Sequence, residues 1–233
     1  MVLAGGFGTR LKSAVSNVPK PLAPVGDKVF LFYLLQSLYR QGFRNIDLSL
    51  FHDAQKIIFW VEALEKPADL KLRYAVEPSP LGTAGAIAFC RDFFAYADNL
   101  FICNGDTFLS AGASNLLENP SDLNLIGLVE VGDISRYGAV ETADDGTILK
   151  FSEKSEQKQK GWINSGLYLL RPSLLRSLKP KSSSLEKDFF TQLAAQKQLK
   201  GERLQSLFID IGLPEDYSRF VQMVQNKEVI ESW

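Results

Sequence analysis

Residues 3–25 read LAGGFGTRLKSAVSNVPKPLAPV, and this stretch indicates which fold the N-terminal part of the chain adopts. An apolar run, Met1 to Ala4, predicts the end of a short buried strand, and glycines follow it at once. Glycines let backbone N–H groups approach a phosphate closely, and Arg10 supplies a planar fork for phosphate oxygens. We therefore expect a strand that opens into a loop for the phosphate tail of a nucleotide.

The same stretch excludes two common phosphate-binding motifs. It lacks the Gly-Lys-Ser/Thr of a P-loop, and residues 6–11 (GFGTRL) lack the third glycine of the dinucleotide pattern. Lys20 lies between Pro19 and Pro21, whose locked φ angles predict a stiff, extended segment that aims the ammonium group. The alternative, in which Lys20 is merely solvated and the glycines form an ordinary turn, stays open.

Beyond this stretch, strand and helix patterns alternate along the first half of the chain. The predicted strands are 46–50, 72–76 and 100–103, and the predicted helices are 30–41, 54–65 and 84–94. This alternation predicts an α/β fold with a Rossmann-like, mixed but mostly parallel sheet that helices flank on both faces. After Gly105-Asp106, β-rich runs joined by short turns predict a smaller part with mixed or antiparallel strands. That part has predicted strands at 125–131, 139–142, 148–153, 163–170 and 204–209 and predicted helices at 185–196 and 214–225, with a solvated loop at 155–160.

The composition is that of a soluble globular protein, with 45% hydrophobic residues, 23% charged residues and a formal net charge of −1. This balance gives no electrostatic reason to expect a nucleic-acid or membrane partner, and no stretch is apolar enough for a membrane span. Cys90 and Cys103 each lie in an apolar run, which favours reduced core thiols and a cytoplasmic location. Because His52 is the lone histidine, chemistry should rest on carboxylates, lysines and arginines.

Several further motifs follow the opening stretch in order. They are EPSPLGTAGAI (77–87), NGDTF (104–108), RYGAV (136–140), FSEK (151–154), INSGLYLL (163–170) and FIDIGLPEDY (208–217). Together these motifs resemble the sugar-1-phosphate nucleotidyltransferases, and within that family the D-glycero-D-manno-heptose 1-phosphate guanylyltransferases. The resemblance implies the nucleotide-diphospho-sugar transferase fold, as a single domain over 1–233. It also implies a nucleotide-binding half at 1–108 and a sugar-phosphate-binding half at 109–233.

The resemblance implies a role for each matching residue. The expected catalytic residues are Arg10, Lys20 and Lys154. The residues expected to bind nucleotide or sugar are Leu3, Ala4, Gly5, Gly6, Gly8, Thr9, Glu77, Pro80, Gly82, Thr83, Gly138, Glu153 and Asn164. Asp106 and Asp210 each follow an apolar strand, where open α/β sheets place ligands, and the resemblance makes them the pair that holds Mg²⁺. Taken singly, either aspartate could instead be a turn or capping residue.

Glu77 indicates the nucleotide. A carboxylate only accepts hydrogen bonds, and guanine offers it two adjacent donors, whereas a pyrimidine with one N–H between two carbonyls would better suit glutamine. We therefore expect GTP as the nucleotide. The resemblance implies transfer of its nucleoside monophosphate to a sugar 1-phosphate, with D-glycero-α-D-manno-heptose 1-phosphate as the favoured acceptor. Pyrophosphate leaves and a nucleotide-activated sugar forms. The attacking phosphate is already anionic, so the reaction needs no protein nucleophile.

Other interpretations stay open. The enzyme could be a thymidylyl- or uridylyltransferase acting on a hexose 1-phosphate, or could use phosphocholine as the acceptor. The chain could also be a non-catalytic regulatory subunit that binds nucleotide sugars on the same fold. Glu153-Lys154 could form an exposed ion pair, and Tyr137-Gly138 and Asn164-Ser165-Gly166 could be ordinary turns. A monomer and a homo-oligomer are both compatible with the sequence.

Overall fold

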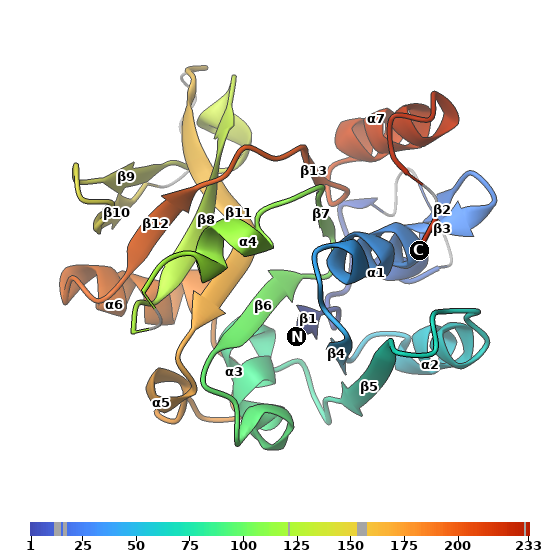
Figure 1. Ribbon diagram of the computed structural model, residues 1–233, viewed down its shortest axis with the longest axis horizontal. Coiled ribbons are helices and arrows are strands. Elements are labelled where there is room, and N and C mark those ends of the chain that lie inside the picture. Colours follow the sequence, from blue (N-terminus) through green and yellow to red (C-terminus); the bar gives the residue numbers. More distant parts are fainter. Residues whose placement is uncertain (12–14, 16–17, 121, 153–157, 231) are drawn as a thin grey trace. The chain divides into compact units, whose positions relative to one another are not determined.

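We describe the 233-residue chain from a computed structural model (Figure 1). The structure describes residues 1–11, 15, 18–120, 122–152, 158–230 and 232–233. These residues group into two compact units. Unit 1 comprises Met1–Pro80, Asn104–Ser110 and Leu207–Trp233, and unit 2 comprises Leu81–Cys103 and Ala111–Ser206. Each unit is therefore assembled from segments that are far apart in the sequence.

Parallel strands form the centre of unit 1. β1 (Val2–Leu3) pairs with β4 (Asn45–Leu50), and β4 pairs with β5 (Lys71–Val76), in both cases in parallel. Every residue of β4 after Asn45 is buried, including the polar Asp47 and Ser49. A strand that is covered on both faces is typical of parallel sheets. The parallel pairing predicted for the first half of the chain is confirmed in this unit.

Helix α1 (Phe30–Arg40) is the core helix of unit 1, because all residues from Phe30 to Leu38 are buried. Phe30 and Tyr33 pack edge-on against Phe220 of α7 (Pro214–Gln225), with ring centroids 5.5 and 5.6 Å apart. Phe108 contacts the same Phe220 ring at 5.0 Å. Burial of one large apolar side chain contributes about 1.5–3 kcal/mol. This aromatic cluster therefore holds three distant segments of the chain in one unit.

Two short strands bring the predicted metal ligands together. β7 (Thr107–Leu109) pairs antiparallel with β13 (Phe208–Asp210), and Asp210 lies opposite Thr107. The backbone N–H of Ile211 donates to the carbonyl oxygen of Asp106, at 3.0 Å. Asp106 and Asp210 are thus neighbours because of a strand pairing. The remaining elements of unit 1 are η2 (Lys20–Leu22), β2 (Pro24–Val25), β3 (Lys28–Val29) and α2 (Ala54–Glu62).

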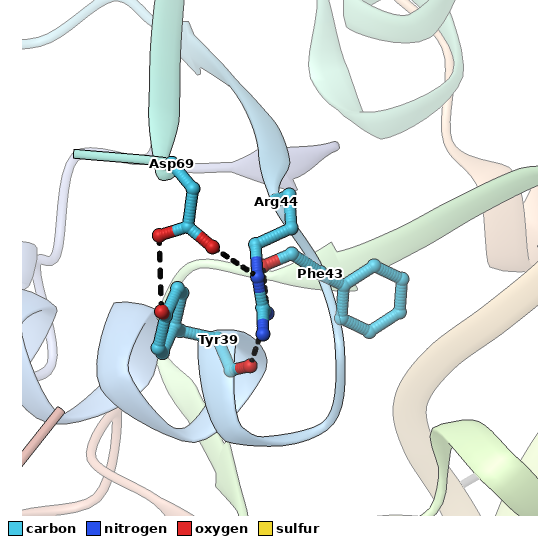
Figure 2. Close-up of polar contacts among 4 residues, drawn as sticks. All are labelled: Tyr39, Phe43, Arg44 and Asp69. Carbon is cyan, nitrogen blue, oxygen red and sulfur yellow. Dashed lines mark hydrogen bonds and ion pairs between the residues drawn. The ribbon is translucent and has the colours of Figure 1, made fainter. Parts of the chain in front are cut away.

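A polar cluster secures the C-terminal end of α1 (Figure 2). Arg44 donates from Nε to Asp69 at 2.8 Å, and from Nη1 to the carbonyl oxygens of Tyr39 and Phe43 at 2.7 and 3.2 Å. The Tyr39 hydroxyl donates to the other carboxylate oxygen of Asp69 at 3.0 Å, and this hydrogen bond raises the pKa of Tyr39 above its ordinary value. Because the last carbonyls of a helix lack partners within the helix, Arg44 satisfies one of them. The cluster fastens α1 to the segment that precedes β5.

The long strand β11 (Gly161–Leu170) organises unit 2. It pairs antiparallel with β6 (Leu100–Asn104) on one side and with β8 (Leu125–Val131) on the other. β8 pairs in parallel with β12 (Lys200–Arg203), and β9 (Val140–Thr142) forms an antiparallel ribbon with β10 (Ile148–Phe151). The mixed pairing predicted for the second part of the chain is confirmed. The helices of unit 2 are α3 (Gly82–Phe89), η3 (Arg91–Phe94), α4 (Ala113–Leu117), η4 (Ile134–Arg136), α5 (Pro172–Leu175), the π-helix η5 (Leu185–Phe190) and α6 (Thr191–Ala195).

Three predicted elements are corrected in their extent. The helix predicted over 84–94 ends at Phe89 and is followed by the 3₁₀ turn η3. The helix predicted over 185–196 begins as the π-helix η5 and continues as α6. The single strand predicted over 204–209 is replaced by β12 before it and β13 at its end, since these two strands pair with different partners, β8 and β7. A local apolar pattern does not report which partner a strand will find.

The extended segment predicted around Lys20 is wrong. Pro19 is extended, but Lys20–Leu22 form one 3₁₀ turn. The turn closes through hydrogen bonds from Leu22 N to Pro19 O at 2.8 Å and from Ala23 N to Lys20 O at 3.0 Å. The locked φ of Pro21 suits the first turn of a helix as well as an extended chain, and here the helical turn prevails.

Other expectations from the composition can be compared with the structure. Cys90 and Cys103 are both free and buried, which confirms the prediction of core thiols. Among the described residues, every helix is too short or too polar to cross a bilayer. Residues 158–160 of the predicted solvated loop are exposed and have no regular secondary structure, whereas the rest of that loop lies outside the described residues.

Candidate active site

The glycine loop of unit 1 follows β1 and brings the backbone close to two functional side chains. A Cβ atom on Gly5 would lie 2.9 Å from Oε1 of Glu77, and a Cβ on Gly8 would lie 3.1 Å from Cβ of Lys20. Gly8 also has φ +61°, a conformation that favours glycine. On Gly6, a Cβ would meet no described atom within 4 Å. The loop is therefore packed against Lys20 and Glu77, whereas the space beside Gly6 is open. An open position of this kind suits a loop that receives a ligand.

Lys20 reaches the first of the two predicted metal ligands. Its Nζ donates to Oδ2 of Asp106 at 2.7 Å. The Lys20 side chain is 10% exposed and that of Asp106 is 35% exposed. An ammonium held in this way is oriented by burial and by its partner, and it keeps two further N–H donors. The structure thus places Lys20 beside Asp106, as the motif pattern predicts.

Asp210 is the electrostatic centre of the cluster. Burial raises the pKa of its carboxyl above the usual range, and the negative charge of Asp106 raises it further. The backbone N–H of Gly212, which donates to Oδ1 at 2.8 Å, and the charges of Lys20 and Arg10 lower the same pKa in part. The pKa of Asp210 therefore responds to Asp106, Lys20 and Arg10, which are three of the charged residues that the sequence predicts to share one site.

Gly212 lies beside both the Asp210 carboxylate and the Lys20 ammonium group. A Cβ atom at this position would lie 2.7 Å from Oδ1 of Asp210 and 2.7 Å from Nζ of Lys20. Only a residue without a side chain lets the ammonium and the carboxylate approach the same backbone atom. Sequence reasoning missed Gly212, although it stands two residues after Asp210 in the FIDIG motif.

The two aspartates leave room for a further ligand. Lys20 occupies Oδ2 of Asp106, and Gly212 N occupies Oδ1 of Asp210. Within the described part of the chain, the second oxygen of each carboxylate has no hydrogen-bond partner, and no three His, Cys, Asp or Glu side chains cluster as a metal cage. Two carboxylates with water and phosphate oxygens are typical of protein sites for Mg²⁺. The donor set therefore fits a magnesium ion that a phosphate substrate helps to hold.

Glu77 is buried directly after β5, with 6% of its surface exposed. The Ser49 hydroxyl donates to its Oε1 at 2.8 Å, and the backbone N–H of Glu77 donates to Leu50 O at 2.7 Å. Next to these residues, Ala4 N donates to Ser49 O at 2.9 Å. Glu77 is thus held rigidly beside the glycine loop. Ser49, which fixes one of its oxygens, is a positioning residue that the sequence did not indicate.

The residues expected at the base and the sugar that belong to unit 2 lie on α3, β11 and the turn after η4. Gly82 has φ +67°, and a Cβ there would lie 2.5 Å from the carbonyl oxygen of Ser183, so this position needs glycine. The next residue, Thr83, accepts a hydrogen bond from Leu185 N at 2.7 Å. The segment 183–185 therefore fastens the first turn of α3.

Asn164 lies where the register between β11 and β8 shifts. Its Nδ2 donates to the Tyr168 hydroxyl at 3.1 Å, and its Oδ1 accepts from Gly166 N at 2.9 Å. Gly138 has φ +88° and donates from its backbone N–H to Ile134 O at 2.9 Å, so it is a tight turn after η4. Two hydrogen bonds therefore orient the side chain of Asn164, whereas the structure shows Gly138 as part of a backbone turn.

The remaining predicted residues take less defined places. Leu3 is the last residue of β1 and Ala4 follows it at the start of the glycine loop, while Thr9 and Pro80 are exposed. Glu153 and Lys154 lie outside the described residues. Sequence reasoning also missed Tyr168 and Glu186. Glu186 bonds Tyr168 and Thr83, which lie 18 and 103 residues away, so no local pattern indicates it.

Comparisons with known proteins identify the family of the chain. A family described as Nucleotidyl transferase matches residues 1–227. The D-glycero-alpha-D-manno-heptose 1-phosphate guanylyltransferase of Campylobacter jejuni is 33% identical over 221 residues, which cover 95% of this chain and 97% of that protein. The mannose-1-phosphate guanylyltransferase catalytic subunit beta of Dictyostelium discoideum is 32% identical, with 93% of this chain and 62% of that protein covered. Both relatives are guanylyltransferases by name.

Solved structures agree as well. HddC from Yersinia pseudotuberculosis superimposes with a TM-score of 0.86 at 34% identity, covering 96% of this chain and 97% of that chain. A second structure of HddC, complexed with GMP-PN, has a TM-score of 0.84 at the same identity and coverage. These likenesses confirm the predicted α/β fold class and the resemblance on which the site was assigned. The chain belongs to the nucleotidyl transferase family.

Proposed function

We propose that this protein transfers GMP from GTP to a sugar 1-phosphate, with D-glycero-α-D-manno-heptose 1-phosphate as the favoured acceptor. A phosphate oxygen of the sugar attacks the α-phosphorus of GTP, the bond from that phosphorus to the bridging oxygen breaks, and pyrophosphate leaves. The observation that carries the proposal is the convergence of Lys20, Asp106 and Asp210. The positive charge of Arg10 also acts on the Asp210 carboxylate. These groups suit a reaction in which negative charge moves onto a leaving pyrophosphate.

Each charged residue then has a role. Lys20 and Arg10 neutralise the triphosphate, and positioning of the attacking and leaving groups in line does most of the work. Asp106 and Asp210 would hold Mg²⁺ through the carboxylate oxygens that have no hydrogen-bond partner among the described residues. The ion, when bound, supplies positive charge to the phosphate oxygens. The raised pKa of Asp210 supports this role, because both its burial and the neighbouring Asp106 carboxylate disfavour its negative charge, and a bound cation would favour it.

The preference for guanine rests on Glu77. Its carboxylate accepts hydrogen bonds only, and the Ser49 hydroxyl holds Oε1 beside Gly5. Guanine has two adjacent N–H donors on one edge, which suit such an acceptor. The family resemblance also assigns the exposed Pro80 and the backbone at Gly82 and Thr83 to binding of the base. The guanylyltransferase relatives and the GMP-PN complex of HddC support the same nucleotide.

The sugar-phosphate side of the site is proposed from unit 2. Asn164 keeps one N–H and one lone pair for sugar hydroxyls, Gly138 allows a close approach, and Glu153 and Lys154 would meet the sugar hydroxyls and the sugar phosphate. The division into a nucleotide half at 1–108 and a sugar-phosphate half at 109–233 belongs to the same proposal. We place the reaction in the cytoplasm, with small-molecule substrates and without a nucleic-acid or membrane partner.

A screen of purified protein against GTP, dTTP and UTP with a set of sugar 1-phosphates tests this function. We expect Mg²⁺-dependent pyrophosphate release that is fastest with GTP and the heptose 1-phosphate, and a GDP-sugar product by mass spectrometry. Mannose 1-phosphate is the most informative competing acceptor, because mannose-1-phosphate guanylyltransferases are among the relatives. A preference for dTTP or UTP would overturn the assignment of Glu77. Tight nucleotide-sugar binding without turnover on any pair would instead support a regulatory subunit.

A further inference from the structure

A hydrogen-bond network in unit 2 joins residues that are proposed to bind the nucleotide with a residue that is proposed to bind the sugar. The Glu186 network consists of Thr83, Asn164, Tyr168, Ser184 and Glu186. At Glu186, Oε2 accepts from the Ser184 hydroxyl at 2.8 Å and from the Thr83 hydroxyl at 3.2 Å, and Oε1 accepts from the Tyr168 hydroxyl at 3.4 Å. Three hydroxyl groups from three different elements thus converge on one carboxylate.

The carboxylate determines the direction of every bond in the network. Because Glu186 only accepts, the Tyr168 hydroxyl must donate to it, and the phenol oxygen is then an acceptor for Asn164 Nδ2 at 3.1 Å. The amide of Asn164 therefore has its nitrogen toward Tyr168 and its Oδ1 toward Gly166 N. One N–H and one lone pair of this amide remain, pointing in fixed directions. Glu186 thus sets the orientation of the asparagine proposed to bind sugar hydroxyls.

A second arm of the network reaches the nucleotide side. The Thr83 hydroxyl donates to Glu186 and accepts from Leu185 N at 2.7 Å, so both its donor and its acceptor functions are used. Ala84 N donates to Ser183 O at 3.1 Å, and Ser183 N donates to Leu81 O at 3.0 Å. The first turn of α3 is held by this segment. Gly82 and Thr83 are proposed to bind the base. Glu186 is therefore linked to the base through Thr83 and to the sugar through Tyr168 and Asn164.

The element that carries Glu186 is suited to hold it still. Glu186 is the second residue of the π-helix η5, a wide turn that is rare and frequently found at functional sites. The Thr191 hydroxyl donates to the Glu186 carbonyl at 3.0 Å. Tyr168 is fully buried, and its ring packs against that of Phe190 with 5.0 Å between centroids. A packed tyrosine and a π-helix place the carboxylate with little freedom to move.

We propose that Glu186 is a positioning residue that fixes Asn164 through Tyr168 and the first turn of α3 through Thr83, and so sets the affinity for both substrates. The inference rests on the proposed function, because it takes Asn164 and Thr83 as substrate-binding residues. The proposal gives Glu186 no contact with the reacting phosphates, since its described side-chain hydrogen bonds go to Thr83, Tyr168 and Ser184. Its effect should therefore appear in KM for each substrate more than in kcat.

Three substitutions separate the two arms. Tyr168→Phe removes the link to Asn164 only, and we expect KM for the sugar 1-phosphate to rise about tenfold with KM for GTP within about twofold. Thr83→Val removes the other link, and we expect the opposite pattern. Glu186→Gln puts an amide where three hydroxyls need an acceptor, so both KM values should rise, each by about three- to tenfold. Calorimetric titration of GTP into each variant gives a second readout, independent of turnover.

Asp188→Asn is the matched control. Asp188 lies on the same π-helix, is exposed, and accepts from Ser184 N at 2.8 Å, but it has no described contact with Tyr168 or Thr83. It should leave both KM values within about twofold. The double variant Glu186→Gln, Asn164→Ala should have the same sugar KM as Asn164→Ala alone, because the path to the sugar passes through Asn164.

The outcomes decide between the inference and the function on which it rests. If the unaltered protein forms no nucleotide sugar with any substrate pair, both are overturned. If it is active but Glu186→Gln leaves both KM values unchanged, or if Tyr168→Phe raises the two KM values equally, only the positioning role is overturned. Should Glu186→Gln fail to fold, as thermal unfolding would reveal, the two single-arm variants still carry the test.

Discussion

The charged cluster of unit 1 and the Glu186 network of unit 2 differ in how far the protein itself satisfies their charges and hydrogen bonds. In unit 1, Lys20, Asp106 and Asp210 form a charged cluster, and burial, together with the negative charge of Asp106, raises the pKa of Asp210. In unit 2, the single carboxylate of Glu186 accepts from three hydroxyls. The first arrangement is electrostatically unsatisfied without a ligand, whereas the second is satisfied by the protein alone.

This difference indicates a division of labour. A cluster of charged side chains around a buried carboxylate is suited to stabilise a charged transition state. A network whose donors and acceptors already match is suited to hold side chains in place before the substrate arrives. Substitutions in the first region should therefore lower kcat, and those in the second should raise KM. The predictions below test that contrast, beginning with the largest effect.

Lys20→Ala should give the largest loss, a fall in kcat of about 100- to 1,000-fold, because it removes a buried cation from the leaving pyrophosphate. The loss of this positive charge should also raise the pKa of Asp210 further and move the acidic limb of the pH profile to higher pH. Steady-state kinetics across pH measure both effects. Lys28→Ala, at an exposed lysine of the same unit, is the control and should behave like the unaltered protein. A kcat within tenfold of normal would remove Lys20 from the mechanism.

Asp210→Asn should lower kcat by about 100-fold and weaken the dependence on Mg²⁺, yet raise the melting temperature at neutral pH. The sign follows from the raised pKa of Asp210. A carboxyl with a higher pKa in the folded state favours folding when it is protonated, and its ionisation destabilises the fold as pH rises through that pKa. The gain in stability should shrink as pH falls toward the usual carboxyl range. Thermal unfolding at several pH values measures it, and a lower melting temperature at neutral pH would contradict the like-charge interpretation.

Gly82→Ala tests unit 2 without removing any polar group. The new Cβ would meet the carbonyl oxygen of Ser183 at 2.5 Å, and the positive φ adds backbone strain, so we expect a destabilisation of about 1–3 kcal/mol. KM for GTP should rise more than kcat falls, because the first turn of α3 must shift. Gly6→Ala is the matched control for stability, since its Cβ would meet no described atom within 4 Å. Equal unfolding free energies for the two variants would show that the Ser183 contact is unimportant.

Arg44→Ala should have the smallest effect and none on catalysis. It removes the hydrogen bonds to the Tyr39 and Phe43 carbonyls and a half-exposed ion pair with Asp69, which together contribute about 1 kcal/mol or less. The pKa of Tyr39 is raised mainly by its own bond to Asp69, so spectroscopic titration of that hydroxyl should still show a raised value. A change in kcat or KM would mean that the cluster in Figure 2 influences the site, which nothing in its contacts indicates.

The sequence predicted the helices, strands and loops that are determined by the residues of one short stretch. α1 and α7 follow from helical apolar spacing, β4 from a buried run, and the glycine loop from Gly5 and Gly8, where a side chain would meet close neighbours. The extended form of the Lys20 segment was predicted wrongly, since proline permits both an extended chain and a helical turn. Residues 153–154 were assigned roles by resemblance and lie outside the described part of the chain.

The sequence by itself thus determined the fold class, the family and the chemical types of the candidate site residues, because spacing, glycine and charge are properties of short stretches. Only the tertiary structure decided that β7 pairs with β13, which makes Asp106 and Asp210 neighbours, and that Thr83, Tyr168 and Glu186 share one network. Such pairings depend on which surfaces of the whole chain bury each other, and no local pattern encodes that choice.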